Sequence, residues 1–157
     1  MRKICFILAA ISMIVLVACD KYSDMQWEFI KFDMTGIQAT VNKSTHSYEI
    51  RVPKEGADFT FRPTKERMGF FFNSCWQYPD SNSLRVNSSY ISLKGDWFEA
   101  NLENEKDEKN QYKILQTTLH VHIDPLKNDD NVDENGNRKV KIGLEGPYRS
   151  ADLLFVQ

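Results

Sequence analysis

Alternation of apolar and polar residues with a period of two is the feature that most limits what this chain can fold into. The stretch SYEIRV places Tyr48, Ile50 and Val52 on one side, and ADFTF does the same with Phe59 and Phe61. Successive side chains of a β-strand point to opposite faces, so these segments indicate half-buried strands. Beyond an apolar N-terminal stretch, the spacing typical of amphipathic helices is absent, and the pattern predicts an all-β chain.

Three later segments continue the alternation: KILQTTLHVHID (113–124), RKVKIGL (138–144) and ADLLFV (151–156). Between the first two strands, PKEG has turn chemistry, since Pro53 cannot donate to a ladder and Gly56 tolerates a positive φ. We therefore expect a hairpin there. Short strands separated by turns predict a single immunoglobulin-like β-sandwich.

Two other regions carry fewer signals. Residues 64–95 are the least regular, with a strand expected over 68–72 and a loop at QYPDSNS. The acidic stretches at 103–111 and 127–138 are interpreted as solvated loops. Because they flank one strand, we expect them at opposite ends of the sandwich.

The N-terminus has the features of an export signal. Arg2 and Lys3 precede Ile4–Ala18, an almost unbroken apolar run of 15 residues. A membrane-spanning helix needs about 20 apolar residues, so this run fits a cleaved signal better. Its end, Leu-Val-Ala-Cys, resembles a bacterial lipobox, which implies a diacylglyceryl group on Cys19. We expect a protein held by lipid on a bacterial envelope membrane, most simply the outer membrane.

This interpretation divides the chain into a signal peptide (1–18), a tether with a docking segment (19–35) and the sandwich (36–157). Without Arg2 and Lys3, 18 of the 20 basic residues and all 22 acidic residues remain, a formal charge of −4. An acidic balance argues against a nucleic-acid partner, which requires a basic face. Cys75 is then the one thiol of the folded part, and with no activating base nearby we expect it to be buried and structural.

The order of the segments resembles the BACON domain, a β-sandwich module named for Bacteroidetes proteins. SYEIRVPKEGADFTF is similar to its opening hairpin, GDWFEANL to its central tryptophan segment, and NRKVKIGLEGPYRSADLLFVQ to its ending, so the resemblance covers residues 37–157. It implies a packing role for Trp97, no catalytic apparatus, and binding of carbohydrate or mucin glycans or spacing of other domains. Ala57 stands where the family often has a second glycine, and segments 64–95 and 124–138 are longer than its usual connections.

One group of residues suggests a metal. His120, His122 and Asp124 alternate on an expected strand, so their side chains point the same way and could bind zinc as part of a hydrolase. A solvated polar strand face explains the same residues and is the simpler interpretation. We expect no cofactor and no enzymatic activity.

The stretch CWQYPDSNS is the candidate for ligand binding. Sugar sites combine aromatic side chains with amide and carboxylate partners. The candidate residues are Trp76, Gln77, Tyr78, Asp80 and Asn82. Because tryptophans are mostly buried, a core position is favoured for Trp76, whereas Tyr78 is expected to be exposed.

The sequence therefore predicts a lipid-anchored, non-catalytic binding module for a glycan, mucin or an envelope protein partner. Two alternatives remain: a structural or assembly subunit that pairs through a sheet edge, and the zinc-dependent hydrolase centred on His120 and His122.

Overall fold

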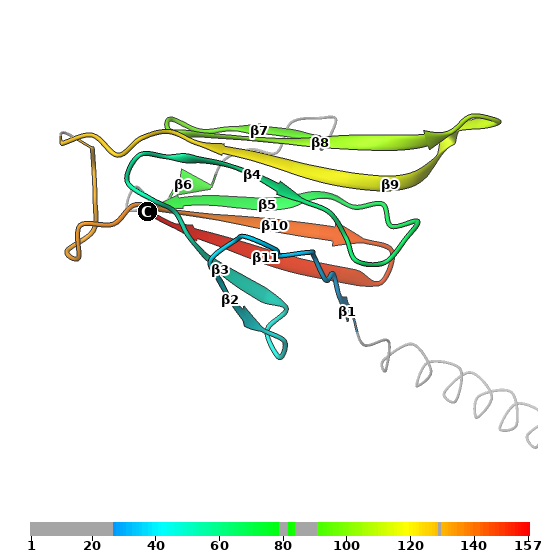
Figure 1. Ribbon diagram of the computed structural model, residues 1–157, viewed down its shortest axis with the longest axis horizontal. Coiled ribbons are helices and arrows are strands. Elements are labelled where there is room, and N and C mark those ends of the chain that lie inside the picture. Colours follow the sequence, from blue (N-terminus) through cyan, green and yellow to red (C-terminus); the bar gives the residue numbers. More distant parts are fainter. Residues whose placement is uncertain (1–26, 79–81, 84–90, 129) are drawn as a thin grey trace, which may run out of the picture.

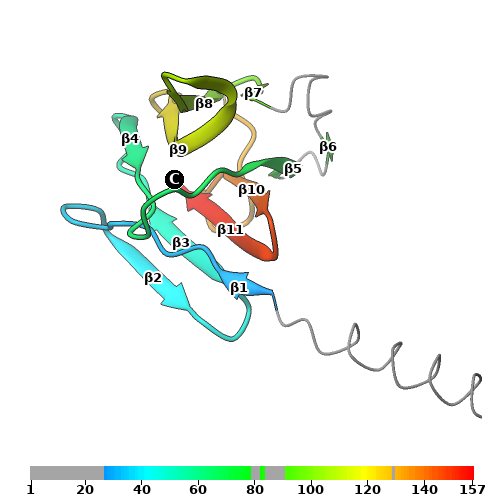
Figure 2. The same cartoon turned by 90° about the vertical axis from the view of Figure 1, so that its right-hand side faces the viewer.

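The computed structural model describes residues 27–78, 82–83, 91–128 and 130–157, and these ranges form strands, turns and loops without a helix. Two β-sheets pack face to face (Figure 1). Figure 2 shows the same layers after a quarter turn, with β4, β9, β8 and β7 in the upper one. The predicted all-β sandwich is confirmed. Nothing in the described ranges is a helix of the length and apolarity that crossing a bilayer requires.

The larger sheet has the order β2-β3-β11-β10-β5-β6, with β1 added beside β11. Its strands are β1 (Glu28–Phe29), β2 (Ala39–Asn42), β3 (Ser47–Arg51), β5 (Phe71–Tyr78), β6 (Asn82–Ser83), β10 (Lys139–Gly146) and β11 (Arg149–Val156). Strand β11 pairs antiparallel with β10 but parallel with both β3 and β1. The last strand in chain order therefore lies inside the sheet.

The smaller sheet has the order β4-β9-β8-β7 and is antiparallel throughout. Its strands are β4 (Ala57–Phe61), β7 (Ser92–Lys94), β8 (Phe98–Asp107) and β9 (Asn110–Ile123).

The core lies between the sheets and is formed by the apolar positions of the alternating segments. Its largest fully buried side chains are Phe61, Phe72, Phe155, Ile30, Ile50, Leu119, Ile123, Ile142, Leu144, Leu153, Val121 and Val140. Trp97 is buried as well. Residues from β3, β9, β10 and β11 alternate between buried and more exposed positions, so the period-two pattern identified the inward faces of these strands correctly.

The hairpin expected between residues 47–52 and 57–61 is not formed. Strand β3 belongs to the larger sheet and pairs with β2 and β11, whereas β4 belongs to the smaller sheet and pairs with β9. The turn between them, closed by a hydrogen bond from Gly56 N to Pro53 O of 3.1 Å, carries the chain from one sheet to the other. Turn residues mark where a strand ends, but they do not show which strand the next one joins.

Two loop boundaries also differ from expectation. Strand β5 begins at Phe71 and continues to Tyr78, so the first residues of the expected loop are strand. Residues 103–107 belong to β8, and the acidic turn shrinks to the two residues between β8 and β9. This turn and the loop 124–138 lie at opposite ends of the sandwich, as predicted (Figure 1).

The segment before residue 36 packs on the sandwich. Ile30 and Phe32 are buried in the core, Phe29 and Met34 pack against it, and Trp27 is exposed. The hydroxyl of Tyr48 donates to Ile30 O (3.1 Å) and accepts from Phe32 N (3.0 Å). These contacts make residues 29–34 part of the folded body.

Candidate functional site

The outer face of the larger sheet carries two exposed aromatic side chains on β5. Trp76 and Tyr78 keep 42% and 39% of their surface exposed. They stand two residues apart on one strand, so both point away from the core, about 7 Å apart along it. The core position favoured for Trp76 is wrong, because Cys75 occupies the inward position beside it. The expected exposure of Tyr78 is confirmed.

Gln77 points the opposite way from its two neighbours. It is 3% exposed, and its Nε2 donates to Asp96 Oδ2 at 3.1 Å. Its side chain therefore joins β5 to the turn before β8 and is not available at the outer face, which corrects its assignment as a ligand contact. Asp80 lies outside the described residues. Of Asn82 only the backbone is described, and it pairs with Gln77.

Charged side chains flank the two aromatic residues on the neighbouring strands. Lys141 and Lys139 of β10 are in register with Trp76 and Tyr78. Lys141 Nζ lies 2.7 Å from Asp152 Oδ2, and Lys139 Nζ lies 2.7 Å from a carboxylate oxygen of Asp133. The hydrogen bond from Lys139 is the main reason that the pKa of Asp133 lies below its usual value.

Polar side chains continue this face along β5 and β10. Gly143 lacks a side chain that would collide with those of Asn73 and Ser74. Asn73 Nδ2 donates to Glu145 Oε2 at 3.1 Å, and Ser74 Oγ donates to Asn73 Oδ1 at 3.0 Å. Beside the aromatic pair, the face thus presents amide, hydroxyl and paired charged groups.

Phe71 is an exposed aromatic residue of the same face that the sequence interpretation missed. Strand β5 has an extra residue at Asn73, because Ser74 pairs with Gly143 while Phe72 pairs with Leu144. This β-bulge turns Phe72 inward and Phe71 outward. Strict alternation from Trp76 would have placed Phe72 outside, so period two alone could not find it.

The two histidines of β9 lie on the outer face of the smaller sheet, each bonded to a neighbour. His122 Nδ1 lies 2.7 Å from Asp58 Oδ1, and its Nε2 lies 3.1 Å from Asp124 Oδ1. The hydrogen bond to Asp58, and secondarily the one to Asp124, raises the pKa of His122. His120 contacts Thr60 Oγ1 through Nδ1 at 3.2 Å and Glu103 Oε2 through Nε2 at 3.1 Å.

This arrangement does not resemble a zinc site. Zinc binds neutral imidazole through a free lone pair, but both ring nitrogens of His122 face carboxylates that favour the protonated ring. Across the ranges that the structure covers, no three His, Cys, Asp or Glu residues converge as metal ligands. The set His120, His122 and Asp124 therefore stands in line along the sheet without enclosing a position for an ion.

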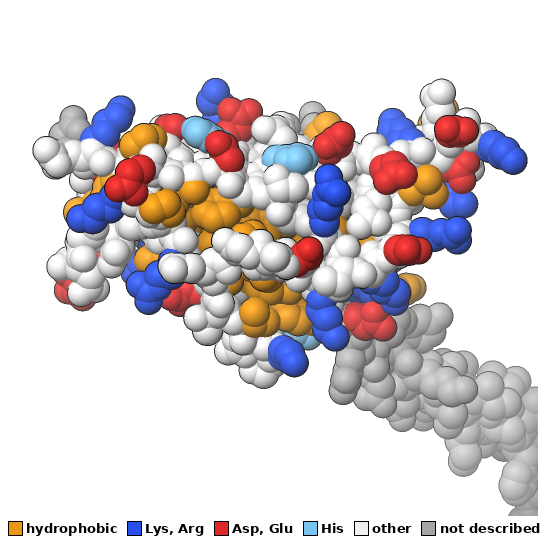
Figure 3. All heavy atoms as spheres, viewed as in Figure 1, with side chains coloured by type: hydrophobic (Ala, Val, Ile, Leu, Met, Phe, Trp, Pro, Cys, Tyr) orange, Lys and Arg blue, Asp and Glu red, His pale blue; other side chains and the backbone are white. Residues whose placement is uncertain are grey.

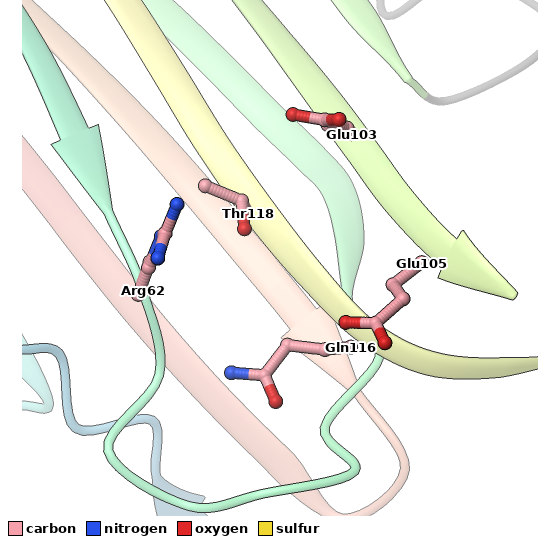
Figure 4. A pocket seen from close by; sticks show the side chains of 5 residues that line it. All are labelled: Arg62, Glu103, Glu105, Gln116 and Thr118. Carbon is pink, nitrogen blue, oxygen red and sulfur yellow. The ribbon is translucent and has the colours of Figure 1, made fainter.

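Beside the histidines, the same face has a polar hollow of about 470 Å³. Figure 4 shows its lining, with Arg62 reaching from the end of β4 toward Thr118 of β9, and Glu105 lying near Gln116. The hollow is open, and its charged side chains are solvated. Carboxylates in such surroundings lack the burial that separates a general acid from a general base.

Cys75 is buried in the core, and burial raises the pKa of its thiol to about 12. A thiol held protonated cannot serve as a nucleophile near neutral pH. Cys19, the predicted lipidation site, and the signal peptide lie outside the described residues.

Comparisons with known proteins give the fold and little else. No family model and no curated protein matches the chain. A solved structure described as "NMR structure of the protein from Bacteroides thetaiotaomicron" is similar, with 19% sequence identity and a TM-score of 0.50. The match covers 80% of this chain and 85% of that one. At this identity the likeness supports the shared architecture alone.

Proposed function

We propose that this chain is a lipid-anchored, non-catalytic module of a bacterial envelope that binds glycan, such as mucin sugar chains, through the outer face of β5 and β10. The observation that carries the proposal is the pair Trp76 and Tyr78, both exposed and both directed outward from one strand. Apolar side chains that are exposed next to each other on a protein surface often mark a binding site.

The chemistry around the pair suits a sugar. Pyranose rings have apolar C–H faces that stack on aromatic rings, and hydroxyl groups that need both donors and acceptors. Lys141 with Asp152 and Lys139 with Asp133 supply both kinds of group, and each charge is balanced by its partner. This balance favours a neutral, hydroxyl-rich ligand over a strongly charged one.

The membrane anchor is the second part of the proposal. The lipobox resemblance assigns a diacylglyceryl group to Cys19, and the BACON resemblance agrees with an envelope module that lacks catalytic groups. The test is metabolic labelling of the full chain with a palmitate analogue in a bacterial host. Labelling that survives Cys19→Ser contradicts the anchor.

Glycan binding is tested with residues 20–157, screened against neutral and anionic glycans and mucin, followed by titration calorimetry. Removing both rings in Trp76→Ala/Tyr78→Ala is expected to weaken binding about 30-fold, since each stacking contact contributes about 1 kcal/mol. Tyr112→Ala is the matched control, because Tyr112 is 98% exposed and lies on β9 of the other sheet. Equal losses in both variants, or no glycan signal at all, would overturn the binding face.

The free edge of the larger sheet supports a second candidate, an assembly subunit. Among the described residues β2 pairs with β3 alone, and Val41 on it is exposed. A partner strand could add to this edge, although β2 has four residues and offers a short ladder. Cross-linking at Val41→Cys in intact cells tests it, and a monomeric product with no captured envelope protein argues against it.

A further inference from the structure

The end of the sandwich at which the described chain begins has an exposed aromatic pair of its own. Trp27 precedes β1 and is 49% exposed, and Tyr148 in the β10–β11 turn is 63% exposed. Glu28 N donates to Tyr148 O at 2.8 Å, so the backbone next to Trp27 lies beside that of Tyr148. The parallel pairing of β1 with β11 holds this arrangement on the rigid body of the sheet.

Cations line a hollow beside Trp27. A hollow of about 740 Å³ is lined by Trp27, Lys31, Lys65 and Arg149, with Glu28 as its one carboxylate. Arg149 Nε lies 2.7 Å from Glu28 Oε2, and Lys65 Nζ lies 3.8 Å from the same oxygen. In Figure 3, Lys and Arg side chains lie at the lower right of the domain with Asp and Glu side chains among them, where Figure 1 places β1. The domain as a whole is acidic, so this local excess of positive charge runs against its average.

The backbone at Tyr148 shows that an aromatic residue there is not a packing requirement. Its φ is +57°, a conformation that glycine adopts most easily and that is uncommon for large side chains. The strained residue gains no burial in return, since most of its side chain is in solvent. Residues held in strained backbone conformations cluster at functional sites.

The reach of the chain brings this end to the membrane. Trp27 follows Cys19 by eight positions, and an extended chain spans at most about 3.6 Å per residue, or roughly 30 Å in all. With lipid on Cys19, the end that bears Trp27 lies within that distance of the headgroups. Trp and Tyr are the residues enriched at membrane–water interfaces, and Lys and Arg are attracted to anionic lipid surfaces.

We propose that the Trp27 end of the sandwich docks on an anionic phospholipid surface, with Trp27 and Tyr148 in the interface and Lys31, Lys65 and Arg149 beside the phosphates. The inference rests on acylation of Cys19 in the proposed function. Docking at this end would orient the domain. Arg149 pairs with Gly146 at the end of β10 near the docking surface, whereas Tyr78 pairs with Lys139 at the opposite end of β10. The β5 aromatic pair then lies toward the end of the sandwich that is farther from the membrane.

The test uses the acylated full-length protein, purified from membranes and reconstituted into phosphatidylcholine vesicles that contain phosphatidylglycerol and brominated lipids, which quench nearby tryptophans. Trp76→Phe keeps Trp27 as the exposed indole, Trp27→Phe keeps Trp76, and buried Trp97 is common to both. We expect quenching several-fold stronger in Trp76→Phe than in Trp27→Phe. Equal quenching in the two variants, or none in either, overturns the docking.

Two double charge-reversal variants test the role of the cations. Lys31→Glu/Lys65→Glu is expected to reduce the quenching of Trp27 at least two-fold, and Lys54→Glu/Lys94→Glu, two exposed lysines elsewhere, is the control with the same change in net charge. No difference between the two double variants overturns the role of the cations. The mass of the Cys19 peptide is measured on the same samples: an unmodified Cys19 refutes the anchor itself, whereas a lipidated Cys19 without quenching refutes the docking alone.

Discussion

The guanidinium of Arg138 lies over the indole ring of Trp97, with Cζ 4.5 Å from the ring centroid. Arg138 is buried, and its Nε donates to Gln157 Oε1 (2.7 Å) while an Nη donates to Asp130 Oδ2 (2.8 Å). The other Nη donates to Asp124 O at 2.6 Å. One side chain thus joins the tryptophan segment, the long loop 124–138 and the end of β11.

Removing this side chain is expected to destabilise the fold strongly. Arg138→Ala leaves the Asp130 carboxylate without its cationic partner and removes a donor from Asp124 O and Pro125 O, and breaking a buried ion pair costs about 3–5 kcal/mol. Urea unfolding followed by tryptophan fluorescence gives the free energy. Arg51→Ala is the control, because its ion pair with Glu49 is exposed and long at 3.7 Å, so the expected change is below about 0.5 kcal/mol. Similar losses in both variants would contradict the network.

Gly36 and Gly56 both have a positive φ. Substituting each by alanine therefore distinguishes the cost of a steric clash from the cost of conformational strain. Gly56 and Gly36 have φ values of +80° and +78°. A Cβ on Gly56 would collide with the carbonyl oxygen of Ile123, whereas nothing lies within 4 Å of one on Gly36. We expect Gly36→Ala to cost about 1 kcal/mol and Gly56→Ala to cost at least about 2 kcal/mol more, measured by thermal and urea unfolding. Equal costs would mean that the crossing turn has room to relax.

The stabilising effect of His122 is expected to depend on pH. Asp58 and Asp124 bond its ring and raise its pKa, while Glu99 stands opposite it on β8. A histidine with a raised pKa contributes its full stabilisation below the unfolded value of about 6.5, and that contribution is lost as pH rises through the folded pKa. His122→Ala should therefore cost stability near pH 5.5 and much less near pH 8.5.

The size of this effect is limited because the site is exposed, so we expect less than about 1 kcal/mol. NMR titration of the imidazole protons gives the pKa directly, and Asp58→Asn should lower it. A titration midpoint at or below about 6.5 in the unmodified protein would contradict the geometry.

Cys75 should resist thiol reagents until the protein unfolds. With a pKa of about 12, its thiolate population at pH 8 is roughly 2,000-fold smaller than that of a free cysteine with a pKa of about 8.5. In residues 20–157 it is the one cysteine, so the labelling rate with Ellman's reagent in native buffer and in urea gives the ratio directly. Labelling within about ten-fold of the unfolded rate would show that the core around β5 opens readily.

The sequence predicted the inward faces of the strands well, because burial and alternation are coupled in each strand. Ile50, Val121 and Ile142 are all buried as their spacing requires. The sequence did not predict which strands β3 and β4 pair with. A turn such as Pro53–Gly56 has the same composition whether it closes a hairpin or connects two sheets. Pairing depends on contacts far apart in the chain, such as β3 with β11, and local residues carry no signal for these.

The candidate site was predicted in part for the same reason. The stretch around Trp76 was identified by its composition. Which of its side chains point into the core and which point outward depends on where β5 begins and ends. Gln77 proved to be inside and Phe71 outside, the first because β5 extends to Tyr78 and the second because of the bulge at Asn73. Neither feature has a marker in single-residue preferences.

The central position of β11 has a consequence for the order in which the sheets can be completed. All four strands of the smaller sheet are complete once residue 123 has emerged, but the two halves of the larger sheet cannot be joined until residues 149–156 follow. Until then, the larger sheet that covers the apolar inner face of the smaller sheet is incomplete. The sandwich therefore closes only after the final strand of the chain is available.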